Sequence, residues 1–274
     1  MALTPYLELE NVSAYLGERR VFDGLNLELN LGEQTAVLGP NGAGKSALVK
    51  LISREIYPLV VPGSSLKVFG SSTVNLWALR RRLGLVSSDL QGRYKPQIPG
   101  LDVVLSGWFG SVGLGRDQEP TTAQRQHAVE LMDELGLSAL INERFGQLSE
   151  GQRRRLLIAR ALVHGPEVLV LDEPTNALDL KAKHQLLDLL RQLAQQGTTI
   201  LLVTHQIEAI IPEINRCVLL EQGQIIGDGT SRAVLQNKTL SRLFGTPLKV
   251  IEANGYRQVL PDESGENWYF ERQV

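Results

Sequence analysis

The chain has 274 residues, 43% hydrophobic and 21% charged, with a formal net charge of -2. This length is enough for one large domain or for a core with an inserted subdomain, and the composition is that of an ordinary globular protein. The charge balance argues against a dedicated nucleic-acid binder, the single cysteine excludes an internal disulfide, and no apolar run approaches the ~18–20 residues of a membrane span.

The first part of the chain is expected to form strands. Residues 1–8 lack the basic start and long apolar centre of a secretory signal. Apolar and polar residues alternate in residues 7–9 and 25–29, which predicts half-buried strands, and the apolar residues 35–38 predict a buried parallel strand. Residues 66–69 and 83–87 are further short strand candidates.

A glycine-rich segment follows the strand at 35–38. Residues 39–46 read GPNGAGKS and match the phosphate-loop pattern G-x-x-x-x-G-K-[ST], in which backbone N–H groups surround a nucleotide's phosphates. The residues after it predict a helix whose N-terminal dipole faces the anion. Lys45 would reach the outer phosphates, and the Ser46 hydroxyl would bind Mg²⁺. The nucleotide-binding residues predicted from this segment are Gly39, Pro40, Asn41, Gly42, Ala43, Gly44, Lys45, Ser46 and Ala47.

From about residue 89 to 147 the sequence changes character and predicts a helical insert. A helix is expected to begin near Thr121, which has capping-box spacing to Gln124, and to stop at Gly136. The core resumes with a helix over 150–163, a strand over 168–171, a helix over 180–195 and a strand over 199–203. Strands alternating with helices predict a mostly parallel sheet covered by helices.

Two carboxylates end the predicted strand at 168–171. Because ligands of open α/β sheets bind at the carboxyl ends of the strands, Asp172 suits Mg²⁺ and Glu173 suits the attacking water, which it would orient or deprotonate. The alternative is that the pair only solvates the end of a strand.

Residues 148–152 read LSEGQ. Ser149 and Gln152 have capping-box spacing, so Ser149 is predicted to begin a helix whose free N–H groups favour an anion, with Gly151 allowing close approach. The segment resembles the LSGGQ signature of the ATP-binding-cassette (ABC) ATPases, with Glu150 in place of the first signature glycine. In that family the signature helix contacts the γ-phosphate of ATP held by the opposite subunit. An ordinary helix cap is the alternative.

The resemblance extends over most of residues 7–245. It implies an α/β fold: a P-loop NTPase core of mostly parallel sheet, an antiparallel β subdomain and an inserted helical subdomain at about 89–147. Asp179 resembles the family's D-loop aspartate facing the partner subunit, and His205 the switch histidine at the γ-phosphate. Tyr15 lies where the family stacks an aromatic ring on adenine, although a core tyrosine is an equal alternative.

One departure concerns the family's glutamine that senses Mg²⁺. Its place falls at Ser87-Ser88, with Gln91 a few residues on. Either Ser88 takes its place at the metal, or Gln91 reaches the metal through a different loop shape.

Residues 101–109 resemble the insert of importer ATPases for iron-chelate, cobalamin and molybdenum-type substrates. Trp108 and Phe109 would form either an exposed docking patch or the core of the insert. The arginine runs at 80–82 and 153–155 are interpreted as solvated helix faces, not as nucleic-acid contacts.

The resemblance implies a cytoplasmic ATPase subunit, peripheral to the inner face of the membrane, that forms a head-to-tail homodimer and works with a separate membrane-spanning subunit. The cofactors would be ATP and Mg²⁺, and the catalytic residues Lys45, Glu173 and His205. A soluble ABC ATPase acting in repair, assembly or regulation is the alternative, and a small-molecule kinase would leave residues 149–152 unexplained.

Residues 246–274 are expected to be a separate C-terminal extension. Asn254-Gly255 between residues 249–253 and 256–260 predicts a two-residue hairpin, on which Trp268, Tyr269 and Phe270 are expected to pack.

Overall fold

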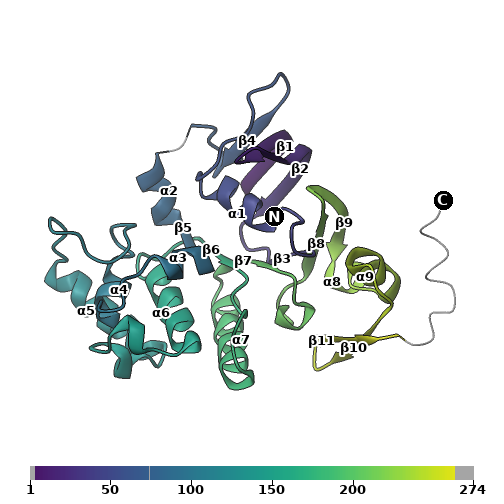
Figure 1. The fold of residues 1–274 in the computed structure, drawn as a ribbon. Helices are drawn as coiled ribbons and strands as arrows, with labels where there is room; N and C mark the ends of the chain where they lie inside the picture. Colours follow the sequence, from purple (N-terminus) through teal and green to yellow (C-terminus); the bar gives the residue numbers. More distant parts are fainter. Residues whose placement is uncertain (1–3, 74, 263–274) are drawn as a thin grey trace. The chain divides into compact units, whose positions relative to one another are not determined.

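The structure is a computed structural model that describes residues 4–73 and 75–262. The predictions made for residues 1–3 and for Trp268, Tyr269 and Phe270 lie outside these residues. Contacts divide the chain into two compact units: Met1–Ser72 with Leu202–Val274, and Thr73–Leu201. Each unit is described by itself (Figure 1).

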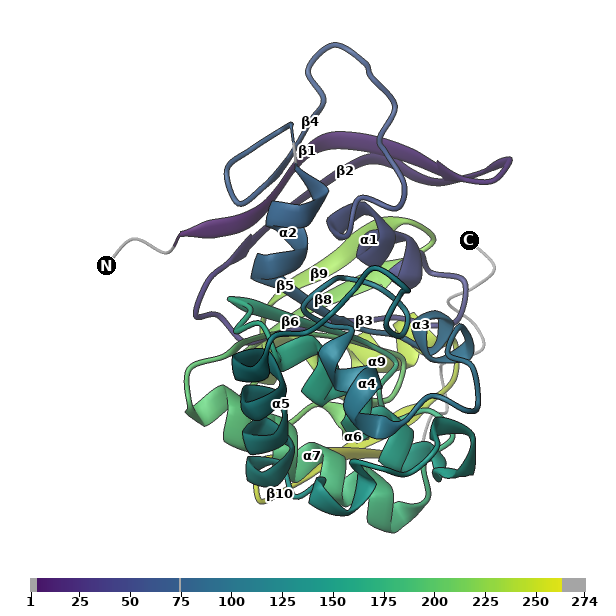
Figure 2. The same ribbon diagram turned by 90° about the vertical axis from the view of Figure 1, so that its left-hand side faces the viewer.

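The first unit contains an antiparallel sheet with strand order β2-β1-β4. Its strands are β1 (Pro5–Leu16), β2 (Arg19–Asn30) and β4 (Ser65–Val68). Figure 2 shows β1 and β2 side by side as a long ribbon. Leu25, Leu27 and Leu29 are buried, whereas Asn26 and Glu28 between them are exposed, so the alternation predicted from sequence is confirmed.

The first unit also carries a parallel strand pair. Strand β3 (Thr35–Leu38), buried along its whole length, pairs in parallel with β8 (Arg216–Glu221), and β9 (Gln224–Thr230) pairs antiparallel with β8. Helix α1 (Lys45–Ile52) follows β3 and buries Leu48, Leu51 and Ile52. The predicted strand–loop–helix order around residues 39–46 is confirmed.

The last elements of the first unit are η3 (Ile207–Ala209), α8 (Ser231–Val234), α9 (Asn237–Phe244), β10 (Leu248–Ala253) and β11 (Tyr256–Pro261). The predicted hairpin is confirmed: β10 and β11 pair antiparallel, and the turn residues Asn254 and Gly255 have φ of 52° and 79°. Strand β10 contacts α9, and β11 contacts η3.

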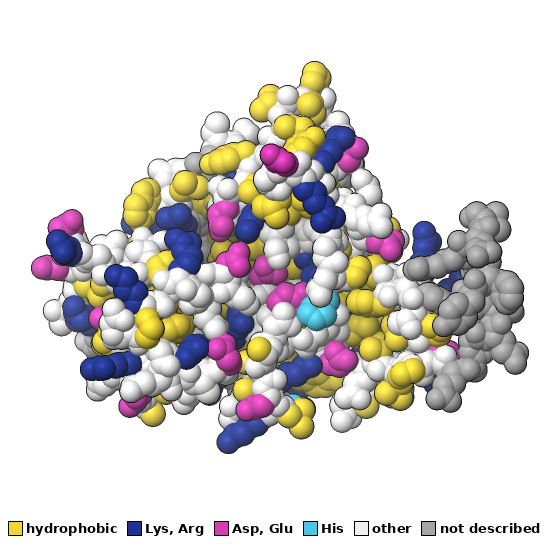
Figure 3. Space-filling model, viewed as in Figure 1, with side chains coloured by type: hydrophobic (Ala, Val, Ile, Leu, Met, Phe, Trp, Pro, Cys, Tyr) yellow, Lys and Arg dark blue, Asp and Glu magenta, His cyan; other side chains and the backbone are white. Residues whose placement is uncertain are grey.

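An exposed apolar loop joins α1 to β4. Figure 3 shows hydrophobic side chains gathered over this loop, at the top of the view. Those exposed on it are Tyr57, Leu59, Val60 and Val61.

The second unit contains β5 (Leu83–Val86) and β6 (Val168–Asp172), which pair in parallel from Leu83 opposite Val168. Strand β7 (Thr199–Thr204) contains the boundary between the units. These strands were predicted, with ends that differ by about one residue. Strand β6 is buried up to Leu171, which brings Asp172 to its carboxyl end.

Helices make up most of the second unit, as the prediction of a helical insert requires. They are α2 (Leu76–Arg82), α3 (Ser88–Gly92), α4 (Gly100–Leu105), α5 (Thr122–Glu134), η1 (Ser138–Leu140), η2 (Phe145–Gln147), α6 (Glu150–Leu162) and α7 (Leu180–Gln195). Figure 1 shows α6 between α4 and α7, and α6 also contacts α3 and β5. Helix α6 is therefore the packing centre of this unit.

Within the described ranges, no helix combines the length and the apolar character that crossing a lipid bilayer demands.

Candidate functional site

The glycine-rich loop of the first unit is shaped by backbone conformations that favour glycine. Gly42 and Gly44 have φ of 80° and 109°, and a Cβ on Gly44 would lie 3.1 Å from Phe22 Cε1. Gly44 is the N-cap of α1 and provides no side-chain hydrogen bond to the first turn. Since the first N–H groups of a helix have no intrahelical acceptor, this helix start is suited to bind phosphate oxygens.

Lys45 lies against this loop. Its side chain is 6% exposed, and Nζ donates hydrogen bonds to the carbonyl oxygens of Gly39, at 2.8 Å, and Pro40, at 3.1 Å. The ammonium group is therefore held over the glycine-rich loop. This position brings positive charge to the place where the sequence predicts the outer phosphates.

The end of β7 lies beside the same loop. The Gly39 N–H donates to the Thr204 carbonyl oxygen at 3.3 Å, and His205, half-buried, is the next residue. A Cβ on Gly39 would lie 2.2 Å from the Leu220 carbonyl oxygen, so only glycine fits there. The predicted switch histidine therefore directly follows the residue that is hydrogen-bonded to the start of the phosphate loop.

Tyr15 is 42% exposed near the end of β1. The interpretation of this residue as a core tyrosine is therefore wrong. An exposed ring is available to stack on a ligand, as the other interpretation requires.

In the second unit, the segment after β6 has an unusual backbone. Glu173, directly after Asp172, has φ of 49°, and Ala177 has φ of 61°. Non-glycine residues adopt this left-handed conformation at a cost of about 1–3 kcal/mol and often do so at functional sites. The segment ends at Asp179, whose Oδ1 caps α7 by accepting from the Ala182 N–H at 2.7 Å.

The tip of α6 has the predicted capping box. Ser149 Oγ accepts from the Gln152 N–H at 3.3 Å, and Gln152 Oε1 accepts from the Ser149 N–H at 2.8 Å. Gly151 is required for packing as well, because a Cβ there would lie 2.6 Å from the Ala182 Cβ. The starts of α6 and α7 therefore touch, which brings the predicted signature residues close to the helix that Asp179 caps.

Ser88 and Gln91, the two candidates for the place of the metal-sensing glutamine, both contact α6. Gln91 Nε2 donates to Glu150 Oε2 at 2.6 Å, and Ser88 Oγ accepts from Arg154 Nη2 at 3.3 Å. Sequence reasoning did not find these contacts, although Glu150 in a glycine position and the serines at 87–88 were the signals of a local change.

Arg154 corrects one prediction. The sequence interpretation of residues 153–155 as a solvated face is wrong for Arg154, which is 2% exposed. Burial lowers the pKa of its guanidinium, and the nearby carboxylates of Glu150 and Asp172 oppose that shift. These carboxylates and the Ser88 hydroxyl offset the cost of burying the charge.

Trp108 and Phe109 are both half-buried. The Trp108 ring packs edge-on against His127 of α5, with 6.0 Å between ring centroids. This contact favours the interpretation of Trp108 as part of the interior of the insert.

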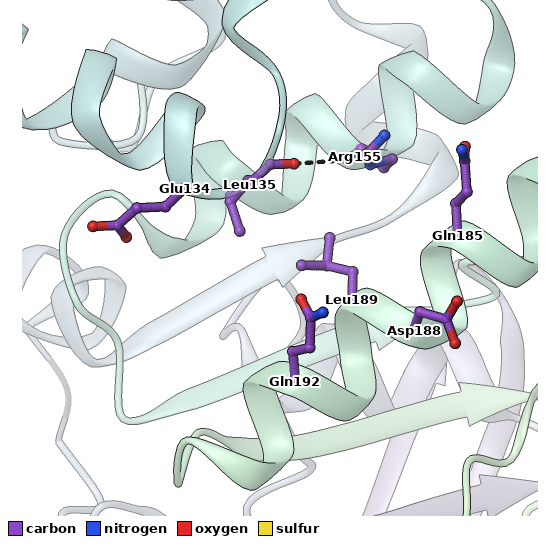
Figure 4. A pocket seen from close by; sticks show the side chains of 7 residues that line it. All are labelled: Glu134, Leu135, Arg155, Gln185, Asp188, Leu189 and Gln192. Carbon is purple, nitrogen blue, oxygen red and sulfur yellow. Dashed lines mark hydrogen bonds between the residues drawn. The ribbon is translucent and has the colours of Figure 1, made fainter.

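A separate cavity of about 200 Å³ lies among α5, α6 and α7. Figure 4 shows the polar side chains around it and the hydrogen bond from Arg155 Nη2 to the Leu135 carbonyl oxygen, which is 2.7 Å long. None of the predicted nucleotide-binding residues lines it. Its lining residues are Glu134, Leu135, Arg155, Gln185, Asp188, Leu189 and Gln192.

Comparison with known proteins decides the family. The model of the ABC transporter family matches residues 22–176, more than half of the chain, and this range includes the phosphate loop, the α6 tip and Glu173. The chain belongs to the ABC transporter family. It is an ATP-binding subunit and an ATPase, as the sequence predicted.

Three known proteins show how far the likeness extends. This ABC ATPase is 32% identical to the hemin import ATP-binding protein HmuV of Photobacterium damsela subsp. piscicida, over 89% of this chain and 91% of the relative. An ABC transporter classed with the metal-chelate type, solved in an inward-facing conformation, is 30% identical with a TM-score of 0.77, covering 95% and 98% of the two chains. A bacterial ABC transporter cassette solved as a dimer is 27% identical with a TM-score of 0.68, covering 82% and 98%.

The residues of this ABC ATPase fit a magnesium nucleotide. The described part of the chain has no group of three or more His, Cys, Asp and Glu residues that would hold a metal ion alone. Mg²⁺ does not require such a group, because it is usually bound by one or two protein oxygens together with substrate phosphates. The first unit offers the Ser46 hydroxyl as an oxygen donor of the required kind, and the second unit, taken by itself, offers the Asp172 carboxylate.

Proposed function

We propose that two copies of this ABC ATPase form a head-to-tail dimer around two ATP molecules. We further propose that this ATP-dependent dimerisation drives transport through a separate membrane subunit. Each ATP would lie between residues 39–46 of one copy and residues 149–152 of the other. The observation that carries the proposal is the tip of α6, which is capped by Ser149. The helix dipole and the N–H groups of the first turn favour an anion there. The phosphate loop of the same chain has donors for the same kind of anion.

The proposal gives separate roles to the residues that bind the nucleotide and to those that bind Mg²⁺. The N–H groups of residues 39–47 and the Lys45 ammonium bind phosphate oxygens, and Tyr15 stacks on adenine. Ser46 and Asp172 hold Mg²⁺, which neutralises charge on the phosphates. Asp179 faces the partner copy.

Hydrolysis is proposed to proceed by in-line attack of water on the γ-phosphorus, while the bond to the β–γ bridging oxygen breaks and ADP leaves with that oxygen. Glu173 orients the water and accepts its proton, while Lys45 neutralises charge that develops on the phosphate oxygens. His205, together with Ser149 of the other copy, donates hydrogen bonds to the γ-phosphate. Positioning and electrostatics provide most of the rate gain, so the loss of one such contact is expected to cost about 3 kcal/mol of barrier.

Glu173→Gln tests the proposal. The amide cannot accept the proton of water, so turnover should fall about 100-fold or more while ATP still binds, and an ATP-loaded dimer should accumulate. Phosphate release measures turnover, and analytical ultracentrifugation with ATP measures the dimer. A variant that hydrolyses ATP at the parent rate removes Glu173 from the mechanism. A strictly monomeric ATP-loaded variant contradicts the head-to-tail dimer.

The transported solute is proposed to be a metal chelate that is imported. The likeness to the hemin importer and to the metal-chelate type transporter supports this class. In that role the chain would work at the inner face of the cell membrane, where a cytoplasmic ATPase meets its membrane subunit.

Capture from native membranes tests the membrane partner. Tagged Glu173→Gln chain, with ATP and Mg²⁺, should retain a protein with several spans of about 20 apolar residues from a mild-detergent extract, identified by mass spectrometry. A beads-only purification is the control. Recovery of no multi-span protein would favour the alternative, a soluble ABC ATPase that acts in repair, assembly or regulation.

A further inference from the structure

The segment after β5 and the tip of α6 are joined by an amide–carboxylate hydrogen bond. Gln91 Nε2 lies 2.6 Å from Glu150 Oε2 in a part-buried setting. Gln91 lies in the short helix α3, which begins after Ser87 and ends at Gly92, and Glu150 is the first residue of α6. Hydrogen bonds to a charged acceptor are shorter and stronger than those between neutral groups, and partial burial limits competition from water.

The second oxygen of Glu150 extends this contact. Oε1 accepts from Arg153 Nη1 at 2.9 Å, one turn along α6. Arg153 in turn donates to the carbonyl oxygens of Phe145, at 3.0 Å, and Gly146, at 2.9 Å, and its guanidinium lies 5.7 Å from the centre of the Phe145 ring. Each carboxylate oxygen of Glu150 therefore has a partner in the network.

The network closes on itself. The N–H groups of Phe145 and Gly146 donate to the carbonyl oxygens of Ile98, at 2.9 Å, and Pro96, at 2.8 Å. Pro96 and Ile98 lie a few residues after Gln91 along the chain. The result is a ring of contacts that runs from Gln91 through Glu150 and Arg153 and returns to the segment after α3.

A second contact runs parallel to this ring. Arg154 Nη2 donates to Ser88 Oγ at 3.3 Å, so two residues of α3, Ser88 and Gln91, are attached to the first turns of α6. Arg154 Nε and Nη1 are buried without a hydrogen-bond partner among the described residues. Moving Arg154 away from Ser88 would leave the charge with fewer partners, which opposes separation of α3 from α6.

We propose that Gln91 and Glu150 are positioning residues for the tip of α6. Ser149, which caps α6, directly precedes Glu150, so the Gln91–Glu150 contact fixes the residues proposed to face the partner's ATP. A shift of the segment after β5 then moves the α6 tip, and ATP at the tip moves that segment. The inference rests on the proposed function, because it assigns these residues to the dimer contact.

The first test is a double-mutant cycle in the Glu173→Gln background. Gln91→Ala and Glu150→Ala should each weaken the ATP-dependent dimer on the order of tenfold, as expected for a lost hydrogen bond to a charged group. The double variant should lose no more than the stronger single variant, because both remove the same contact. ATP affinity, measured below the dimerisation concentration, should stay at the parent value. An unchanged dimer constant, or losses that add, overturns the inference.

A second test exchanges the amide of residue 91 and the carboxylate of residue 150 and measures whether the dimer constant recovers. Gln91→Glu places two carboxylates together and should weaken the dimer, whereas Gln91→Glu combined with Glu150→Gln restores an amide–carboxylate pair and should recover it. The surface of α5 offers a matched control, since Gln126 Nε2 donates to Glu130 Oε1 at 2.9 Å. Gln126→Ala and Glu130→Ala should leave the dimer constant unchanged. A failed rescue, or an equal effect of the control pair, overturns the inference.

Hydrogen exchange of the monomer separates this inference from the proposed function. Gln91→Ala and Glu150→Ala should each speed amide exchange in the first turn of α6, to the level of the double variant, with no nucleotide present. Unchanged exchange there overturns the inference in any oligomeric state. A Glu173→Gln chain that stays monomeric while exchange responds as expected contradicts the head-to-tail dimer, and it overturns the assignment of this contact to dimer formation.

Discussion

Glu173 and Ala177 hold left-handed backbone conformations on either side of a short turn after β6. Neither residue is glycine, so each adopts this conformation at an energetic cost that the surrounding structure must offset. The turn is held by hydrogen bonds from the Asn176 N–H to Glu173 O, at 3.3 Å, and from the Leu178 N–H to Thr175 O, at 3.4 Å. Strain at this place agrees with the role proposed for Glu173, because strained backbone conformations cluster at functional sites.

Burial decides between interpretations that the sequence left open for single residues. Tyr15 is exposed, and Arg154, in the middle of an arginine run, is buried. A run of like charges cannot reveal which member faces inward, because that depends on the neighbours the fold supplies, here Ser88 and Glu150.

His164 is predicted to make stability depend on pH. Burial first, and the nearby Arg160 second, lower the pKa of its imidazole from 6.5 to about 4. The unfolded chain then binds a proton more readily than the folded chain between these values, so stability should fall as pH drops from 6.5 to 4, by about 3 kcal/mol in total.

His164→Gln should lose this part of the pH dependence, and urea unfolding at pH 7.5 and pH 5 measures it. His184→Gln, on the exposed surface of α7, is the matched control. Equal slopes of stability against pH in parent and His164→Gln chains would show that His164 is not the cause.

Helix starts in the described residues differ in how they are capped. Helices α5 and α6 have complete capping boxes, from Thr121 with Gln124 and from Ser149 with Gln152. Helix α1 starts at Gly44, which offers no side-chain cap. The caps stabilise α5 and α6 locally and leave other first-turn N–H groups without intrahelical acceptors, and the start of α1 leaves its N–H groups for the phosphates of the nucleotide.

The caps of α5 and α6 give a matched test of the proposed dimer. Thr121→Ala and Ser149→Ala each remove one cap and should destabilise the chain by about 1 kcal/mol. Only Ser149→Ala should also weaken the ATP-dependent dimer of the Glu173→Gln background, about tenfold, because only that hydroxyl is proposed to reach the partner's γ-phosphate. Thermal unfolding and sedimentation measure the two effects. An equal effect of both variants on the dimer would reduce Ser149 to an ordinary cap.

Across the whole molecule, the elements predicted from local patterns are present, although β1 and β2 extend several residues beyond the predicted ranges 7–9 and 25–29. Helix α7 and strand β3 agree at both ends with their predictions, because a clear periodicity and clear flanking residues define them. The hairpin β10–β11 follows from Asn254-Gly255, which favours left-handed φ. Strands β8 and β9 were not predicted individually. Strand β9 is only partly buried and has no alternation of buried and exposed residues that a sequence pattern could reveal.

The candidate site also contains features that the sequence predicts and contacts that it does not. Residues 39–46, the Ser149–Gln152 box and the Asp172–Glu173 pair were predictable, because each depends on a few neighbouring residues with fixed chemistry. The contacts of Gln91 with Glu150 and of Ser88 with Arg154 were not, because they join residues 59 and 66 positions apart. Sequence indicated only that something had changed at these positions.

The sequence by itself determined the order of strands, helices and phosphate loop, because these depend on local periodicity, glycine conformations and helix caps. The tertiary structure alone decided which charged side chain is buried, which backbone is left-handed at Glu173, and which residue Gln91 binds. Those outcomes depend on distant segments meeting, and the energy of a buried charge or amide is set by the partners that such a meeting supplies.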